Sequence, residues 1–236
     1  MIVSFEHEFV FLKVPKTAGT SVELFLDPLA GEDAIVTRIT PVEPGNRPRN
    51  IAPTPKAVSR ALWSAGRDRA ALGRIVTTAR RREPLFYNHM PASLVRERIG
   101  AKRWNRMYRF CFDRNPWDKS ISRYFWRTRR LDPRPPFDEW AIVAGNLPNA
   151  HRIYTIDGEL AVDTVGRYEH LRDELAAVLT KLGIDTPVDL PHAKASVRPA
   201  QDETPIGERA EAAIRTAFAW ELEHFGWERP AQIPWS

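Results

Sequence analysis

Residues 9–23 read Phe9-Val10-Phe11-Leu12-Lys13-Val14-Pro15-Lys16-Thr17-Ala18-Gly19-Thr20-Ser21-Val22-Glu23, and this stretch decides the fold. Its apolar beginning, residues 9–12, predicts a short buried strand. A turn with Pro15 and Gly19 follows, and residues 21–26 predict a helix. Thr20 and Glu23 have the spacing of a capping box. A strand, a tight turn and a helix start predict an anion site, because backbone N–H groups converge there and the helix dipole adds partial positive charge.

The side chains of this turn suit a phosphate or a similar tetrahedral anion. Lys16 supplies a full positive charge, and Thr17, Thr20 and Ser21 supply hydroxyl donors. The alternative is an ordinary strand-to-helix turn with a surface lysine. A Walker A loop places its lysine directly after a glycine, whereas Lys16 precedes Gly19 here. The pattern therefore argues against the phosphate loop of an ATPase or GTPase.

Composition limits the class of protein. A chain of 236 residues with 43% hydrophobic residues suits one α/β domain with a sizeable core. The net charge of +5 favours an anionic partner such as a nucleotide, an acidic glycan or nucleic acid, although charge runs are usually solvated faces. Cys111 is the sole cysteine, which excludes a disulfide framework or a cysteine-rich zinc site within the chain. Without a signal sequence or an apolar span, we expect a cytoplasmic protein.

Apolar runs and helical patterns alternate along the rest of the chain. They predict an α/β fold, a single domain with a mostly parallel central sheet flanked by helices. Residues 41–55 contain five prolines and predict a loop. The further strands are expected at 34–39, 85–87, 107–112, 152–156 and 161–168. The further helices are expected at 56–82, 92–99, from 116, and at 137–144, 171–182 and 207–225.

Two more candidate site residues follow predicted strands. His89 lies between the strand at 85–87 and the next helix, at the kind of sheet edge where α/β proteins place their chemistry. Arg114 follows the strand at 107–112, and Asn115 and Pro116 are typical of a helix start. A guanidinium in that position could bind a second phosphate bidentately. It could equally be a structural residue that pairs with a neighbouring aspartate, Asp113 or Asp118.

Two motifs taken together, Pro15-Lys16-Thr17-Ala18-Gly19-Thr20-Ser21 and Arg114-Asn115-Pro116-Trp117-Asp118 with Ser122, resemble those of the cytosolic-fold sulfotransferases. The carbohydrate (Golgi-type, family 2) branch is the most similar. The resemblance extends to residues 166–169, 190–192 and 225–227. It leaves 41–82 unmatched, an excursion that we expect near the acceptor site.

The resemblance implies a P-loop-like sulfotransferase fold and an activity. The enzyme would move a sulfuryl group from 3′-phosphoadenosine 5′-phosphosulfate, its co-substrate, to a hydroxyl of a glycan or glycolipid, without a metal. The donor would bind Lys16, Thr17, Ala18, Gly19, Thr20 and Ser21 through its 5′-phosphosulfate, and Arg114 and Ser122 through its 3′-phosphate. Ser196 and Arg198 would contact the donor from a region that departs from the family pattern. Lys16 and His89 would be catalytic, with Glu169 as the second choice of base.

Two other functions are compatible with parts of the sequence. A nucleotide-dependent phosphotransferase with a divergent phosphate loop would bind ATP and magnesium, but the Gly-Lys pair is missing. A basic module that binds nucleic acid or polyanions would show steeply salt-dependent binding. Neither explains why Arg114 and Ser122 accompany the first motif. We therefore expect no nucleic-acid partner, and the oligomeric state stays open.

Overall fold

The computed structural model describes residues 1–41, 43–191 and 204–231. Its centre is a five-stranded sheet with the strand order β3-β1-β2-β4-β7. These strands are β1 (Ile2–Ser4), β2 (Phe9–Phe11), β3 (Ile35–Val36), β4 (Tyr108–Asp113) and β7 (Thr164–Arg167). A separate hairpin pairs β5 (Thr155–Ile156) with β6 (Glu159–Leu160). The α/β prediction is confirmed.

The sheet is mixed, so the prediction of a mostly parallel sheet is only partly right. Strand β4 pairs in parallel with both β2 and β7. Strand β1, which the sequence analysis did not predict, runs antiparallel to β2 and β3. The reason is the short connection at residues 5–8, because so short a turn joins only antiparallel strands.

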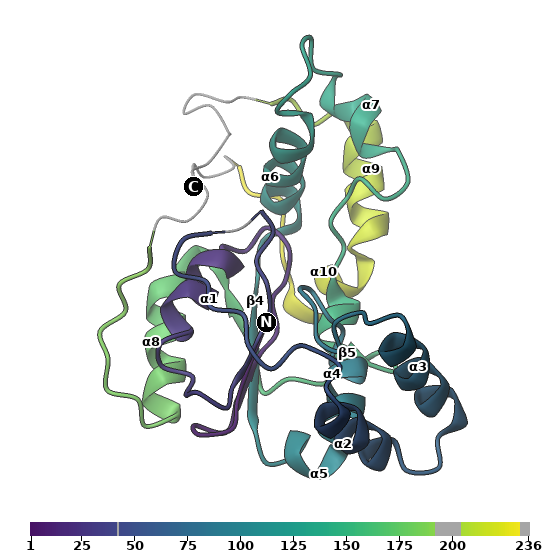
Figure 1. Cartoon of the computed structure of the whole chain (residues 1–236). Helices are drawn as coiled ribbons and strands as arrows, with labels where there is room; N and C mark the ends of the chain where they lie inside the picture. The colour runs from purple at the N-terminus through teal and green to yellow at the C-terminus, as the bar shows by residue number, and fades with distance from the viewer. Residues whose placement is uncertain (42, 192–203, 232–236) are drawn as a thin grey trace.

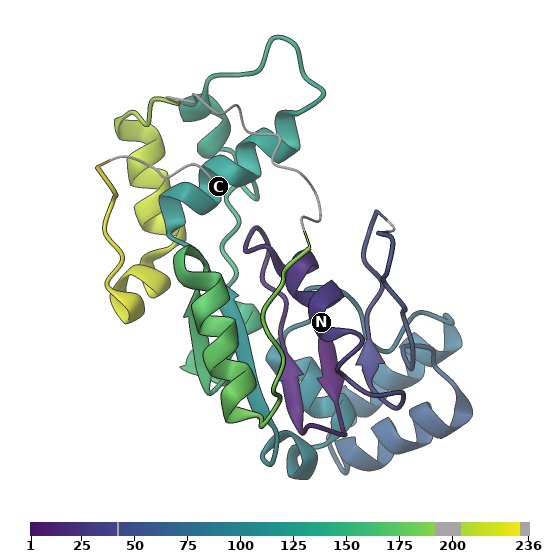
Figure 2. The same cartoon turned by 90° about the vertical axis from the view of Figure 1, so that its left-hand side faces the viewer.

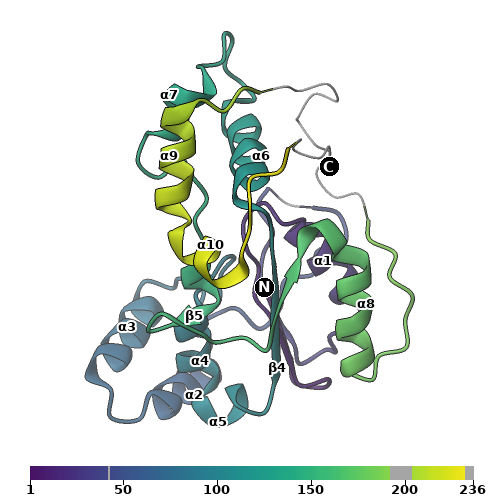
Figure 3. The same cartoon turned by 180° about the vertical axis from the view of Figure 1, so that it is seen from behind.

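Helices cover both faces of the sheet (Figures 1 and 3). Phe9 and Phe11 of β2 pack with Val22 of α1 and Leu175 of α8. Val10, which points to the other face, packs with the core beneath α4. Figure 2 shows α6, α7 and α9 grouped beyond one end of the sheet, where they share a third apolar cluster. The helices are α1 (Gly19–Leu26), α2 (Pro55–Ala65), α3 (Arg69–Arg80), α4 (Ala92–Ile99), α5 (Ala101–Trp104), α6 (Pro116–Thr128), α7 (Phe137–Ala141), α8 (Leu171–Lys181), α9 (Glu208–Ala217) and α10 (Ala219–Phe225).

The strand predicted at 85–87 is absent. Leu85 and Phe86 are buried in the core, and the Leu85 N–H donates to the Ile51 carbonyl at 2.8 Å. No strand pairing includes this segment within the described part of the chain. Its apolar side chains indicate burial, which a strand and a packed loop share.

Two predicted helices are each divided. Residues 56–82 form α2 and α3, because Gly66 adopts a φ of 59° and Asp68 caps the next helix through its side chain. The helix predicted at 207–225 is interrupted at the buried Phe218, which lies between α9 and α10. Among the described residues no helix is both long and apolar enough to cross a bilayer.

The contact between β4 and β7 depends on Gly166. A Cβ added there would lie 2.6 Å from two ring carbons of Phe112. We expect Gly166→Ala to destabilise the protein by about 1–3 kcal/mol through overpacking. Chemical denaturation measures the change. Gly73→Ala is the control, since nothing lies within 4 Å of its added Cβ and alanine favours the surrounding helix α3. A Gly166→Ala protein as stable as wild type would contradict this packing.

Candidate functional site

The turn that contains Lys16 connects β2 to α1. Lys16 and Ala18 adopt left-handed backbone conformations with φ of 67° and 52°. When left-handed residues alternate with right-handed ones, successive backbone N–H groups point toward the same place. They then form a concavity that binds anions. The first N–H groups of α1, which have no acceptor within the helix, face the same end. The local backbone therefore supports the anion site predicted from the sequence.

The predicted capping box is wrong. Helix α1 begins at Gly19 and its cap is Ala18, which forms no side-chain hydrogen bond to the helix. Glu23 is instead fully buried, where its carboxylate pairs with the Lys13 ammonium and with the amino group of Met1. Glu23 also accepts a hydrogen bond from Thr37 at 3.1 Å. A buried ionic network thus lies directly under the turn.

Gly19 is required by this network. The Lys13 side chain crosses the start of α1, and a Cβ at Gly19 would lie 2.7 Å from Lys13 Cγ. Thr17, Thr20 and Ser21 are buried side chains of the same turn. The Thr17 hydroxyl donates to the Val14 carbonyl at 3.0 Å. Part of the hydroxyl set predicted to bind an anion therefore also holds the turn together.

Arg114 brings the two sequence motifs into contact. Its Nη1 donates to the Lys16 carbonyl at 3.3 Å, across 98 residues of sequence. Its Nε donates to Asp118 Oδ2 at 2.5 Å, and its guanidinium lies 4.1 Å from the centroid of the Tyr168 ring. Arg114 is only 3% exposed. The ion pair with Asp118 is the structural alternative considered for this arginine, and its bond to Lys16 fixes the turn against α6.

The Lys16 ammonium points toward the same helix. It lies 5.0 Å from the centroid of the Trp126 ring on α6, a cation–π contact. Ser122 is half-buried on α6, between Asp118 and Trp126 in sequence. The first turn of α6 is capped as predicted, because the Asn115 side chain accepts from the Trp117 N–H at 3.2 Å.

His89 lies beside this turn although its predicted strand is absent. Its Nδ1 is 2.9 Å from the Lys13 carbonyl, an acceptor, so Nδ1 carries the proton and Nε2 keeps a lone pair. Burial lowers the pKa of His89 to about 4, and the positive charges of Lys13, the Met1 amino group and Arg123 act in the same direction. His89 is therefore neutral at pH 7. Its backbone is also left-handed, with a φ of 58°.

Glu169, the second choice of base, has a structural contact. Its Oε1 accepts the Asn115 N–H at 2.9 Å, at the start of α6. Ser196 and Arg198 lie outside the described residues. No group of three or more His, Cys, Asp or Glu side chains in the described ranges could hold a metal ion.

A buried cluster that was not predicted from the sequence surrounds Asp113, the last residue of β4. The Asp113 carboxylate accepts from Lys119 Nζ at 2.5 Å and from the Tyr154 hydroxyl at 2.8 Å. Burial, and then the charge of Asp113, raise the pKa of Tyr154, which keeps its hydroxyl protonated as a donor. The only available signal was an aspartate directly after a buried strand. These hydrogen bonds hold the C-terminal end of β4 in place beside Arg114.

No family model matches the chain. A segment of 111 residues is 35% identical to a protein of Archaeoglobus fulgidus described as an uncharacterized protein. The aligned segment covers 43% of this chain and 88% of the relative. The two proteins belong to one family. No solved structure matches, and the relative's description assigns no activity, so the function is inferred from the chemistry of the site.

Proposed function

We propose that the protein is a sulfotransferase with a P-loop-like sulfotransferase fold. It would transfer a sulfuryl group from 3′-phosphoadenosine 5′-phosphosulfate to a hydroxyl of a glycan or glycolipid. The observation that carries the proposal is the contact between Arg114 and the Lys16 carbonyl, which joins the two motifs at one edge of the sheet. A histidine with a free Nε2 lies beside them.

The proposed reaction uses three features of this edge. The backbone N–H groups of residues 17–21 and the positive end of α1 receive the phosphosulfate. The acceptor hydroxyl oxygen forms a bond to sulfur while the bond from sulfur to the phosphate oxygen breaks. His89 Nε2 takes the hydroxyl proton, and Lys16 neutralises the charge that develops on the departing phosphate oxygen. The products are a sulfate ester and 3′-phosphoadenosine 5′-phosphate.

The 3′-phosphate is assigned to Ser122 and Arg114. Arg114 is almost fully buried and paired with Asp118, so it also holds the Lys16 turn in place through its bond to the Lys16 carbonyl. Ser122 is the more accessible of the two residues. The acceptor is proposed to approach from the side of His89. The loop between residues 43 and 49, part of the 41–82 excursion, lies beside the C-terminal end of α1, where the Arg47 N–H donates to Asp27 at 2.9 Å.

The direct test measures transfer of radiolabelled sulfate from the donor to a panel of oligosaccharide and glycolipid acceptors. Binding is tested first by following the melting temperature in the presence of 3′-phosphoadenosine 5′-phosphate. A rise in melting temperature with this bisphosphate, and none with ATP and magnesium, is the expected result. Stabilisation by ATP and magnesium alone would favour a phosphotransferase and overturn the proposal.

Ser122→Ala isolates the 3′-phosphate contact. A lost hydrogen bond to a charged group should raise the Kd for 3′-phosphoadenosine 5′-phosphate by about tenfold or more. Isothermal titration calorimetry measures the change. Adenosine 5′-phosphate, which lacks the 3′-phosphate, is the control ligand and should bind the variant and the wild type equally. An equal loss for both nucleotides would contradict the assignment.

A further inference from the structure

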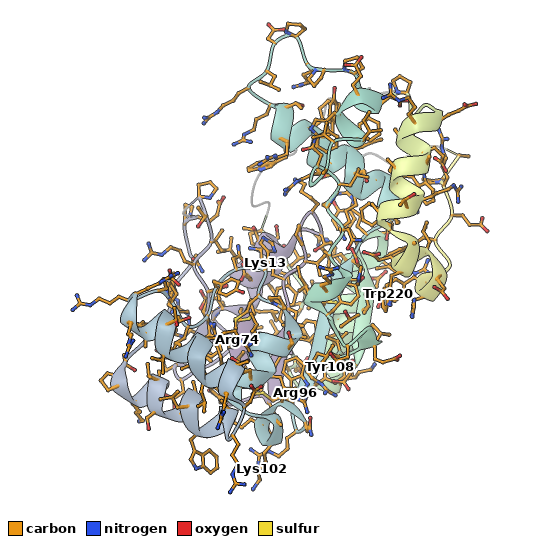
Figure 4. The ribbon with its side chains drawn as sticks, turned by 90° about the vertical axis from the view of Figure 1, so that its right-hand side faces the viewer. Lys13, Arg74, Arg96, Lys102, Tyr108 and Trp220 are labelled. Carbon is orange, nitrogen blue, oxygen red and sulfur yellow. The ribbon has the colours of Figure 1, made fainter. Side chains whose placement is uncertain are left out.

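A cavity lies at the opposite end of strands β2 and β4 from the Lys16 turn. It has a volume of about 540 Å³ and is lined in part by Glu8, just before β2, and Met107, just before β4. Lys16 and Arg114 follow the other ends of these two strands. The six residues of β4 separate the two ends by about 20 Å at 3.3 Å per residue. In Figure 4 Lys102 of α5 lies at the bottom of the molecule, well below Lys13.

Arg98, in the last turn of α4, lines this cavity and is only 6% exposed. Its Nε and Nη1 are buried and have no hydrogen-bond partner among the described residues. The adjacent carboxylate, Glu97, pairs with Arg74 instead. A guanidinium buried without a partner is costly, because it loses its hydration and gains no hydrogen bonds in return.

The groups near Arg98 compensate its charge only in part. The centroid of the Tyr87 ring lies 5.9 Å from the guanidinium, a long cation–π contact, and the carbonyl end of α4 adds a partial negative charge. Burial still lowers the pKa of Arg98. The Arg98 guanidinium is therefore only partly compensated, and a bound anion would supply the missing negative charge and hydrogen-bond acceptors.

The other charges of the cavity are predominantly positive. Arg103 is half-buried, and the exposed side chains Lys56, Arg60 and Arg106 lie on the lining as well. The lining carboxylates, Glu8 and Asp33, are exposed, and Glu8 is 3.8 Å from Arg106. Apolar side chains, among them Phe5 and Phe86, complete the walls. The combination suits a small molecule with one strongly anionic group and a partly apolar body.

We propose that this cavity is a second ligand site, in which Arg98 binds the phosphate or sulfate group of a small organic ester. Arg103 and Arg60 supply further positive charge at its entrance. Phe5 and Phe86 contact the body of the ester. The site is separate from the Lys16 turn and does not depend on the function proposed for that turn.

Phenyl phosphate is the probe, because it has one dianionic group and an apolar body. Its Kd is measured by calorimetry on wild-type protein and on Arg98→Met, a variant that replaces the buried charge with an apolar side chain of similar length. We expect the Kd to rise at least about tenfold, the effect of losing a charge-assisted hydrogen bond. Arg96→Met is the matched control on the exposed side of the same helix, and Lys16→Asn is the control at the other end of the strands. Both should bind the probe as wild type does.

Three results would overturn the proposal: no binding of the probe to wild type at millimolar concentration, an unchanged Kd in Arg98→Met, or a loss confined to Lys16→Asn. Inorganic phosphate is the second probe. Weaker binding than that of phenyl phosphate assigns an organic ester, and equal binding contradicts a role for the apolar walls. If Arg98→Met does not fold, the double variant Arg60→Gln/Arg103→Gln takes its place. A Kd raised at least about threefold supports the site, and an unchanged Kd overturns it.

Discussion

Replacing His89 by asparagine is expected to reduce turnover by about 10²–10⁴-fold, the usual contribution of a general base. Asparagine is the informative substitution for two reasons. It tolerates the left-handed backbone of His89, and its side-chain amide can donate to the Lys13 carbonyl as Nδ1 does. The variant therefore removes the basic nitrogen with little disturbance of the turn. Initial rates at saturating donor and acceptor measure the effect.

Binding of 3′-phosphoadenosine 5′-phosphate should change less than about twofold in His89→Asn, since the histidine is assigned to the acceptor hydroxyl and not to the donor. Loss of turnover together with loss of this binding would instead indicate a structural role for His89. If His89→Asn keeps both its turnover and its binding of the bisphosphate, Glu169 becomes the candidate base.

The pH dependence carries a further signature of His89. Its pKa of about 4 makes kcat/KM independent of this group above about pH 5, with a fall at lower pH as the imidazole becomes protonated. An anionic donor bound nearby favours the protonated form, so the pKa seen in kcat should be higher than that seen in kcat/KM. A kcat/KM profile with its acid limb centred near 6.5 would contradict the burial of His89.

The same pKa predicts how stability depends on pH. The unfolded chain takes up a proton on His89 near pH 6.5, and the folded chain does so only near pH 4. As the pH falls through this interval, the unfolded state binds more protons and His89 destabilises the fold. His89→Asn should therefore lose less stability than wild type between pH 6.5 and 4.

Replacing Lys16 by asparagine is expected to lower kcat by about 10²–10³-fold, the range found when one preorganised electrostatic donor is removed. Asparagine again tolerates the left-handed backbone better than alanine does. The effect should fall mainly on kcat, because the charge on the phosphate oxygen develops as the bond to sulfur breaks. Steady-state kinetics with the donor varied at saturating acceptor separate kcat from KM.

Lys16→Arg is the charge-conserving control. It should retain more activity than Lys16→Asn, although a guanidinium does not reproduce the compact ammonium. Equal activity of wild type and Lys16→Asn would exclude Lys16 from the chemistry. A variant impaired only in KM would reduce Lys16 to a binding residue.

The elements predicted best are those whose starts and ends are marked by residues close in the sequence. The helix at 92–99 has the predicted bounds, and the capped start of α6 follows from Asn115 and Pro116 alone. Strand β2 was predicted because four apolar residues precede a turn with Pro15 and Gly19. Each of these signals lies within a few residues of the element that it marks.

The errors arise where distant parts of the chain decide the outcome. Glu23 does not cap its helix because Lys13 and the Met1 amino group bind it in the core. For Arg114 the sequence left an ion pair with a neighbouring aspartate as an alternative, and the structure shows that pair with Asp118 together with a bond to the Lys16 carbonyl that no local pattern indicates. The cluster around Asp113 unites β4, α6 and Tyr154, which no local pattern connects.

The parallel pairing of β2 with β4 also determines when this site can form during folding. Phe11 is aligned with Phe110, so the chain must close a loop of about a hundred residues, at an entropic cost, before these strands meet. Contacts of such long range slow folding. Arg114 can contact the Lys16 carbonyl only once β4 has paired with β2. The anion site proposed at this turn is consequently completed as the sheet folds, and not before it.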